Sequence, residues 1–521
     1  MVATVGKVGE NFDSNQRSGG LNPLAPNEAP HTPELSLDPT DWAGLRSLGH
    51  RMLDDTLDHL EDVRSRPVWQ PLPAEVAGRF NERLPQTGAG LEAAYAAFER
   101  DVRPYPSGNI HPRFWGWVIG TGTPSGMLAD LLASGLNPNT GGFRQAPVLV
   151  EQQALAWCAE MLGFALDTSG LFVSGASMAN LLALTVARDA HFRKLGVNVR
   201  EDGVMDGALH PVYTSAETHS CNQRAVELLG LGNRQLRRIP VDSEYRLEVT
   251  ALRSRLKEDL ERGERPLALI GTAGMVNTGA IDPLDALADV AEEFGLWFHV
   301  DGAFGALAYL SKELRARLSG MQRADSLSFD LHKWMSLPYG VGCVLVRDAR
   351  AHRQAFALTP DYLRHAERGI AAETWWASEY GPELSRGFLA LKVWMELMTQ
   401  GVQTYAAVIE RNVRQAQYLA QLVTQHPALE LCAPVPLNIV CFRYAPEGLN
   451  ADQTDHLNEE LLMRLQESGE AVLSSTQLNG QYVLRCAIVN HRSTDADFEH
   501  LVRQVEVIGE TMLAELQHPH L

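Results

Sequence analysis

The stretch that decides the fold runs from Leu296 to Val346 and reads LWFHVDGAFGA, a spacer, and then DSLSFDLHKWMSLPYGVGCVLV. Two short apolar runs in it, 296–300 and 326–329, have the composition of buried strands. Asp301 directly follows the first run, and Lys333 follows the second. A carboxylate or an ammonium group at the end of a buried strand needs a partner, because removing either charge from water is costly. We therefore expect Asp301 and Lys333 to bind two ends of one charged molecule.

Pyridoxal phosphate (PLP) is the molecule that suits this pair. Lys333 would hold its aldehyde carbon as a Schiff base, and Asp301 would keep its pyridine nitrogen protonated, so that the ring accepts electrons. A lone lysine in a polar stretch is most often a solvated surface residue. Here the strand ends, the aspartate and the motif described in the next paragraph together favour the cofactor site.

The same stretch resembles the PLP-dependent amino acid decarboxylases of the aromatic amino acid and glutamate decarboxylase family, often called group II. The likeness rests on two motifs, His299-Val300-Asp301-Gly302-Ala303 and Ser328-Phe329-Asp330-Leu331-His332-Lys333-Trp334. The resemblance implies that Ala303, Asp330 and His332 belong to the cofactor-binding set together with the aspartate and the lysine. It also implies the α/β architecture called fold type I.

The order of the predicted elements agrees with that architecture. Strands and helices alternate from about residue 165 to residue 346, which predicts a mostly parallel sheet flanked by helices, with ligand sites at the carboxyl ends of the strands. The first helix is expected to start at Asp38-Pro39, because Asp38 can cap it and Pro39 suits its first position. The expected divisions are a flexible arm (1–36), an N-terminal helical segment (37–109), a PLP-binding large domain (110–398) and a small C-terminal α+β domain (399–521).

Two further strand ends carry candidate cofactor groups. The run Ser174-Gly175-Ala176-Ser177-Met178-Ala179-Asn180 follows an apolar strand and opens a helix, where free N–H groups and the helix dipole suit a phosphate. Simple helix capping explains that run equally well, but the family has a similar SGxSxAN run, which assigns the phosphate to Ala176 and Ser177. His219 follows a strand at 212–215, where a lone histidine usually fills a loop. The resemblance places it on the cofactor ring, where an imidazole can stack, pass a proton or position the substrate carboxylate.

Residues 110–153 are crowded with aromatics and glycines, which fits either an exposed turn region or the wall of a substrate pocket. We favour the pocket, because glycines let the backbone approach a ligand and mainly because the family has a similar run, also beginning His-Pro, that lines its substrate site. The resemblance also shows differences: Gly120 stands where the family often has a hydroxyl residue, and Asn139 and Gly141 stand where it has bulky apolar residues. These differences predict a roomier or more polar pocket than an aromatic-specific one. The resemblance assigns the substrate pocket to Trp117, Val118, Ile119 and Asn139.

The resemblance implies one reaction, decarboxylation of an L-amino acid to an amine and CO₂, with an aromatic amino acid as the favoured substrate class. Its catalytic residues would be Lys333, His219 and Tyr362, where Tyr362 lies on a polar loop and supplies the proton that Cα takes up. In the family, loss of the loop tyrosine or of the stacking histidine marks aldehyde synthases, which also deaminate oxidatively. Both residues are present, which favours simple decarboxylation. The other alternative is a non-catalytic binding protein on the same fold.

Composition limits the partners of this chain. The net charge of −19 argues against nucleic acids and anionic membranes. The six cysteines are scattered without a CxxC pair or metal-type spacing, which predicts reduced thiols, no metal site and a cytoplasmic location. No apolar run is long enough for a membrane span, and the start shows no signal-peptide pattern. The family's shared active sites imply a homodimer.

Overall fold

The computed structural model describes residues 36–165, 167–204, 207–358, 366–372 and 375–517. The chain divides into two compact units after Asp54, and the expected arm lies outside the described residues except for its last residue. Helix α1 (Trp42–Glu61) begins later than Asp38-Pro39, so that prediction is wrong. The carboxylate of Asp41 caps it instead, accepting the N–H groups of Ala43 and Gly44 at 3.1 and 2.9 Å.

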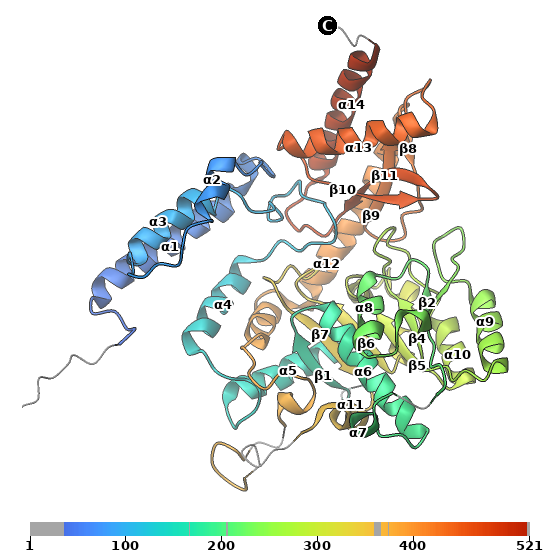
Figure 1. Cartoon of the computed structure of the whole chain (residues 1–521). Helices are drawn as coiled ribbons and strands as arrows, with labels where there is room; N and C mark the ends of the chain where they lie inside the picture. Colours follow the sequence, from blue (N-terminus) through green and yellow to red (C-terminus); the bar gives the residue numbers. More distant parts are fainter. Residues whose placement is uncertain (1–35, 166, 205–206, 359–365, 373–374, 518–521) are drawn as a thin grey trace, which may run out of the picture. The chain divides into compact units, whose positions relative to one another are not determined.

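A large sheet forms the centre of the second unit (Figure 1), and its strand order is β1-β7-β6-β5-β4-β2-β3. Strands β2 to β6 pair in parallel, whereas β7 is antiparallel to both of its neighbours, β1 and β6. The sheet is therefore mostly parallel, as predicted, and every strand except β7 ends at the same edge. The strands are β1 (Ser169–Val173), β2 (Val212–Ser215), β3 (Leu236–Ile239), β4 (Ala268–Thr272), β5 (Trp297–Asp301), β6 (Ser326–Asp330) and β7 (Gly342–Val346).

Helices flank this sheet and cover its apolar strands. Helix α6 packs on β5, β6 and β7, and α10 packs on β4 and β5. In α10, Leu284, Leu287 and Val290 are buried at helical spacing, which explains why this stretch becomes a helix against the sheet. The helices before α12 are α2 (Ala74–Arg79), α3 (Leu91–Asp101), α4 (Pro124–Leu136), α5 (Ala146–Met161), α6 (Ala176–Lys194), α7 (Val199–Asp202), α8 (Ser220–Leu228), α9 (Val249–Glu261), α10 (Leu284–Phe294) and α11 (Ala349–Phe356).

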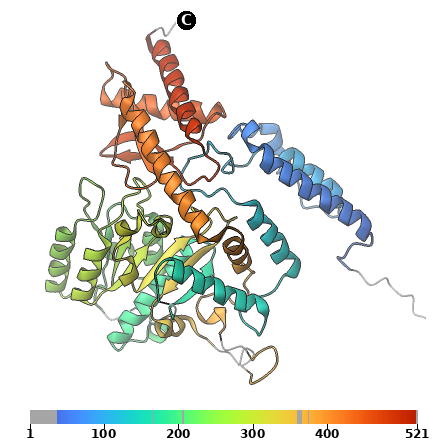
Figure 2. The same ribbon diagram turned by 180° about the vertical axis from the view of Figure 1, so that it is seen from behind.

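Helix α12 (Ala390–Gln425) leads from the large sheet to a second, smaller one (Figures 1 and 2). Its helical geometry is interrupted at Gly401, where φ is 69°, close to the predicted boundary at 398/399. The second sheet is antiparallel, in the order β10-β11-β9-β8, and has its own buried apolar cluster. Its elements are β8 (Leu429–Leu431), β9 (Ile439–Tyr444), α13 (Ala451–Glu467), β10 (Ser474–Leu478), β11 (Gln481–Ala487) and α14 (Asp495–Gln517).

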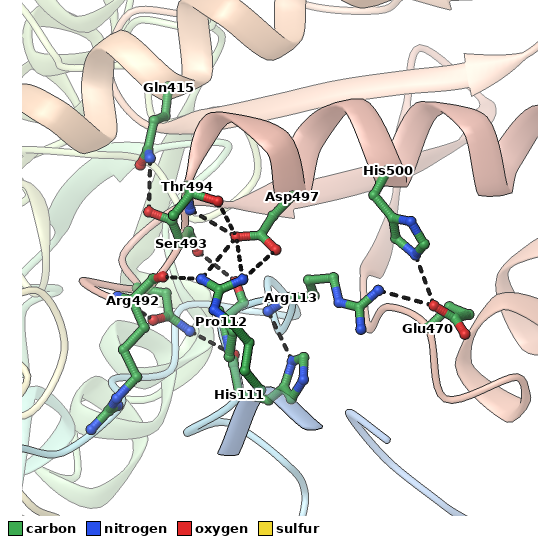
Figure 3. Close-up of polar contacts among 12 residues, drawn as sticks. His111, Pro112, Arg113, Gln415, Glu470, Arg492, Ser493, Thr494, Asp497 and His500 are labelled. Atoms are coloured by element: carbon green, nitrogen blue, oxygen red, sulfur yellow. Dashed lines mark hydrogen bonds and ion pairs between the residues drawn. The ribbon is translucent and has the colours of Figure 1, made fainter. Parts of the chain in front are cut away.

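Residues 110–122, which we call the wall segment, are tied to this small sheet although they precede it by more than 300 residues. Trp115 donates its N–H to Val472 at 2.8 Å and accepts one from Ala487 at 2.9 Å. Figure 3 shows the polar contacts that continue this attachment, including Ser493 Oγ to the Pro112 carbonyl at 2.5 Å. The small sheet therefore holds the wall segment in place.

None of the described helices combines the length and the apolar character needed to cross a bilayer. All six cysteines are free thiols.

Candidate active site

A cavity of about 480 Å³ opens at the edge where the parallel strands end. It lies where ligands bind in open α/β sheets, because the loops after neighbouring strands meet there. Groups that follow β1, β2, β4, β5 and β6 all contribute to it. Its described lining residues are Trp117, Val118, Ser174, Gly175, Ala176, Ser177, Met178, His219, Cys221, Thr272, Gly274, Val276, Asp301, Ala303, Phe304, Asp330, His332, Lys333 and Tyr339.

Lys333 sits at this edge just after β6, with 23% of its side chain exposed. Its Nζ forms an ion pair of 2.9 Å with Oδ2 of Asp330. The other oxygen of that carboxylate accepts the N–H of Ala176 at 2.6 Å, at the start of α6. Asp330 therefore links the lysine to the helix that was predicted to hold a phosphate.

Asp301 is only 3% exposed and is the last residue of β5. Its Oδ2 accepts hydrogen bonds from the side-chain amides of Asn180 at 2.9 Å and Asn222 at 3.0 Å, and the thiol of Cys221 lies 3.9 Å away. Oδ1 accepts the backbone N–H of Ala303 at 3.2 Å. All these donors are neutral, so the buried carboxylate has no cation to offset it among the described residues, which is the chemistry that a protonated pyridine nitrogen would complete.

Asn180 orients this carboxylate through a chain of buried hydrogen bonds. Its oxygen accepts from Nε2 of His299 at 2.9 Å and from the hydroxyl of Ser328, which leaves its nitrogen for Asp301. Burial lowers the pKa of His299 to about 4, so the ring is neutral and its single proton must be on Nε2. Nδ1 then accepts from Ser326 Oγ at 2.9 Å. The amide of Asn180 is thereby fixed in one orientation.

His219 caps the start of α8, where its Nδ1 accepts the N–H of Cys221 at 3.2 Å. Burial lowers the pKa of this imidazole, so it stays neutral. With Nδ1 acting as an acceptor, the ring proton is on Nε2. His219 is thus a hydrogen-bond donor at Nε2 within the cavity lining.

The start of α6 provides the groups that suit a phosphate. The N–H groups in the first turn of a helix have no acceptor inside the helix, and the dipole favours an anion there. The N–H of Ala176 is already donated to Asp330, which leaves Ser177 as the better placed of the two predicted donors. In addition, the hydroxyl of Thr272 lines the cavity, is buried and has no partner in the described part of the chain. Thr272 pairs with Asp301 across β4 and β5, so this hydroxyl lies on the Asp301 side of the cavity, where a polar group of a bound cofactor would satisfy it.

The remaining walls are apolar and aromatic. The ring of Tyr339 packs against the imidazole of His332, with the ring centroids 4.5 Å apart and the planes tilted by 39°. Lys392, buried on α12, donates to the carbonyl oxygens of Pro338 and Tyr339, each at 3.2 Å, and pairs with Asp130 at 3.0 Å. This contact fixes the turn that carries Tyr339 over the cavity.

Of the predicted site residues that the structure describes, all but two meet in this one cavity. Ile119 is outside the lining although its neighbours Trp117 and Val118 are in it. Asn139 is also outside, because its side chain accepts the N–H groups of Gly141 and Arg386 and so stabilises a turn. Tyr362 lies outside the described residues.

Sequence reasoning missed other members of the site. Tyr339 lies in the quoted stretch, and an aromatic residue next to Gly340 could have drawn attention to it. Asn180 closes the SGASMAN run and Asn222 lies just after His219, but nothing in the sequence indicates that both amides reach Asp301.

The chain is similar to known proteins along most of its length. Residues 73–445 match the family model described as "Pyridoxal-dependent decarboxylase conserved domain". The aromatic-L-amino-acid decarboxylase of Bacillus atrophaeus is 35% identical over 470 residues, which cover 89% of this chain and 95% of that protein. The phenylacetaldehyde synthase of Arabidopsis thaliana is 29% identical over 465 residues, covering 87% and 93%. A crystal structure of Oryza sativa TDC with PLP and tryptamine superimposes with a TM-score of 0.85 at 27% identity, covering 92% of this chain and 100% of that one.

Proposed function

The chain belongs to the pyridoxal-dependent decarboxylase family, and from this premise we propose that it removes CO₂ from an aromatic L-amino acid and releases the amine. Its fold is fold type I, and its cofactor is PLP. Amino acid decarboxylation is common to the family, so the proposal concerns the class of side chain that the cavity accepts.

The observation that carries the proposal is the make-up of the cavity walls. Trp117, Phe304 and Tyr339 present aromatic surface, and Val118 adds apolar surface. Lys333 is the only lysine or arginine among the described lining residues. An acidic substrate side chain would need a cation of its own in this partly desolvated space, whereas an aromatic ring needs only apolar contact.

PLP, when bound, supplies an aldehyde that bonds amines and a protonated ring that draws in the electron pair of the breaking bond. In the site, Lys333 offers the amine, and its ion pair with Asp330 keeps Nζ at the end of β6. Asp301 would hold the proton on the ring nitrogen, because a neighbouring carboxylate favours the cation. Its own orientation is set by the Asn180 and Asn222 amides.

The substrate carboxylate is assigned to His219. The ring is neutral and carries its proton on Nε2, so it can donate to a carboxylate but cannot take up a proton at that nitrogen. We propose that Tyr362 donates the proton to Cα. We also infer that the protein is a cytoplasmic homodimer whose active sites use residues of both subunits. Exposed leucines on α4 support the dimer: Leu128, Leu131, Leu132 and Leu136.

The test is a panel of L-amino acids that includes phenylalanine, tyrosine, tryptophan and glutamate, with CO₂, amine and aldehyde measured separately. We expect amine and CO₂ in equal amounts from the aromatic substrates. The Lys333→Ala variant should form neither product. The Lys312→Ala variant, altered at an exposed lysine, is the matched control. A preference for glutamate would refute the aromatic assignment. Aldehyde in place of amine would favour the aldehyde synthase, and the absence of both turnover and visible cofactor absorbance would favour a binding protein.

A further inference from the structure

Arg485, on β11 of the small sheet, is a buried cation close to the site but outside its lining. It is 3% exposed, and the acceptors of its guanidinium in the described chain are neutral: the carbonyl oxygens of Val276 and Asn277 and the hydroxyl of Ser474. Burial lowers its pKa. Burying a cation without a carboxylate partner is costly. The burial of Arg485 therefore needs an explanation, which its three contacts provide.

The first two contacts hold one wall of the cavity. Val276 lines the cavity in the turn that follows β4, and its carbonyl accepts from Nη2 of Arg485. The next carbonyl, of Asn277, accepts from Nε at 3.1 Å. The side chain of Asn277 donates to Glu217 at 2.8 Å, two residues before His219. Arg485 thus fixes a turn that reaches both the cavity and the segment that leads to the histidine.

The third contact holds a second part of the cavity wall. Nη1 of Arg485 donates to Ser474 Oγ at 3.2 Å, and the same oxygen accepts the backbone N–H of Trp117 at 3.1 Å. Trp117 and Val118 line the cavity from the wall segment. The backbone of Trp117 has φ 52°, a left-handed conformation that a bulky residue adopts only when its surroundings impose it. The hydroxyl of Ser474 is part of those surroundings.

We propose that Arg485 and Ser474 are positioning residues that set the separation of the Trp117 wall from the Val276 wall, and hence the size of side chain that the pocket accepts. A guanidinium suits this role because its donors are fixed in one plane, whereas a lysine has a single flexible point of contact. The selection of substrate side chains by size rests on the proposed function. The role of Arg485 and Ser474 in holding the cavity walls does not depend on that function.

The direct test of the holding role is hydrogen–deuterium exchange of peptides that cover the wall segment, in the cofactor-loaded enzyme. Ser474→Ala removes the acceptor of the Trp117 N–H, so that amide should exchange about fivefold faster. Ser475→Ala is the matched control, because this residue points to the other face of β10 and should leave the exchange unchanged. Unchanged exchange in Ser474→Ala would overturn the proposal, whatever the substrate is.

The second readout is the ratio of KM values for tryptophan and phenylalanine. Ser474→Ala and Arg485→Lys should change this ratio by about threefold or more and leave kcat for the better substrate within about twofold, because the walls move and the groups around Lys333 do not. A role confined to stability would lower the melting temperature and leave the ratio as it is, which would overturn the size selection. If the wild-type enzyme decarboxylates no aromatic amino acid, the proposed function fails, and the exchange data still decide whether Arg485 and Ser474 hold the walls.

Discussion

The side-chain nitrogen of Asn180 lies 2.9 Å from Oδ2 of Asp301. Asn222 donates to the same oxygen at 3.0 Å, so the hydrogen-bonding capacity of Oδ2 is used within the protein. Among the described residues, Oδ1 accepts only the N–H of Ala303, and it is the oxygen with capacity left for a ligand. The two asparagines thereby determine which oxygen of the carboxylate serves the cofactor.

Removing either asparagine amide should weaken cofactor binding. We expect Asn180→Ala and Asn222→Ala to raise the dissociation constant of PLP about tenfold, because each leaves Asp301 with one donor fewer and free to turn. Titration of the apoenzyme, followed by visible absorbance, measures this. Gln223→Ala, next to Asn222 but paired with Glu227 on the surface, should bind like the wild type. Equal affinity in all three variants would show that the amides do not orient the carboxylate.

Gly120 is required by a close approach of two backbones rather than by its own flexibility. A Cβ built on it would lie 1.9 Å from the carbonyl oxygen of His332. Gly120→Ala should therefore lower the free energy of unfolding by about 1–3 kcal/mol and displace the segment that carries Lys333. Gly135→Ala, where a Cβ meets nothing within 4 Å, should be neutral or slightly stabilising. Denaturant unfolding measures both, and a wild-type midpoint for Gly120→Ala would contradict the steric account.

Buried histidines should make the protein sensitive to mild acid. Burial lowers the pKa of His352 to about 4, against an ordinary value of about 6.5 in the unfolded chain. Between these values the unfolded state binds a proton that the folded state does not, so stability falls as the pH is lowered from about 6.5 to about 4.

This dependence can be assigned to one residue. In His352→Gln the slope of the unfolding free energy against pH should be shallower by up to about 1.4 kcal/mol per pH unit in that window. His50→Gln, at an exposed histidine, should keep the wild-type slope. Urea titrations at half-unit pH steps give the slopes, and parallel curves for the wild type and His352→Gln would refute the assignment.

Tyr362 is expected to control the product rather than the binding of substrate. Tyr362→Phe removes the proposed proton donor for Cα, so in the presence of oxygen the product should shift from amine toward aldehyde while CO₂ release continues. Chromatography of the amine and the aldehyde measures the shift. Tyr482→Phe, a tyrosine on β11, serves as the control. An unchanged amine yield in Tyr362→Phe would mean that another group delivers the proton.

The sequence allowed the centre of the site to be predicted because of a property of parallel sheets. Asp301, Lys333 and His219 each follow a predicted strand, and parallel strands bring the groups after their carboxyl ends to one edge. It was less predictable which of several consecutive residues line the cavity. Ile119 follows two lining residues and is not itself in the lining, and the side chain of Asn139 stabilises a turn. Motif spacing does not say which of several adjacent side chains faces a cavity.

Contacts between distant parts of the chain could not be predicted at all. Arg485 reaches Asn277 only because the small sheet packs against the turn after β4, and it reaches Ser474 because the two residues pair across β10 and β11. An arginine in a strand has no local pattern that distinguishes a surface charge from a buried one. The predicted start of the first helix was wrong for a different reason. Asp38 and Asp41 are both good capping residues, and only the structure shows that Asp41 is used.

Strand β7 has a consequence for the dimensions of the site. It lies between β1 and β6, and its first residue is Gly342, where a Cβ would lie only 2.7 Å from the Cα of Gly175. The turn before α6 therefore passes close over the start of β7, so that Ala176 and Lys333 reach the two oxygens of one carboxylate, that of Asp330. A ligand bonded to Lys333 needs only a short arm to place an anionic group at the start of α6, so carbonyl compounds with a long chain between the carbonyl and the anionic group should not fit both places.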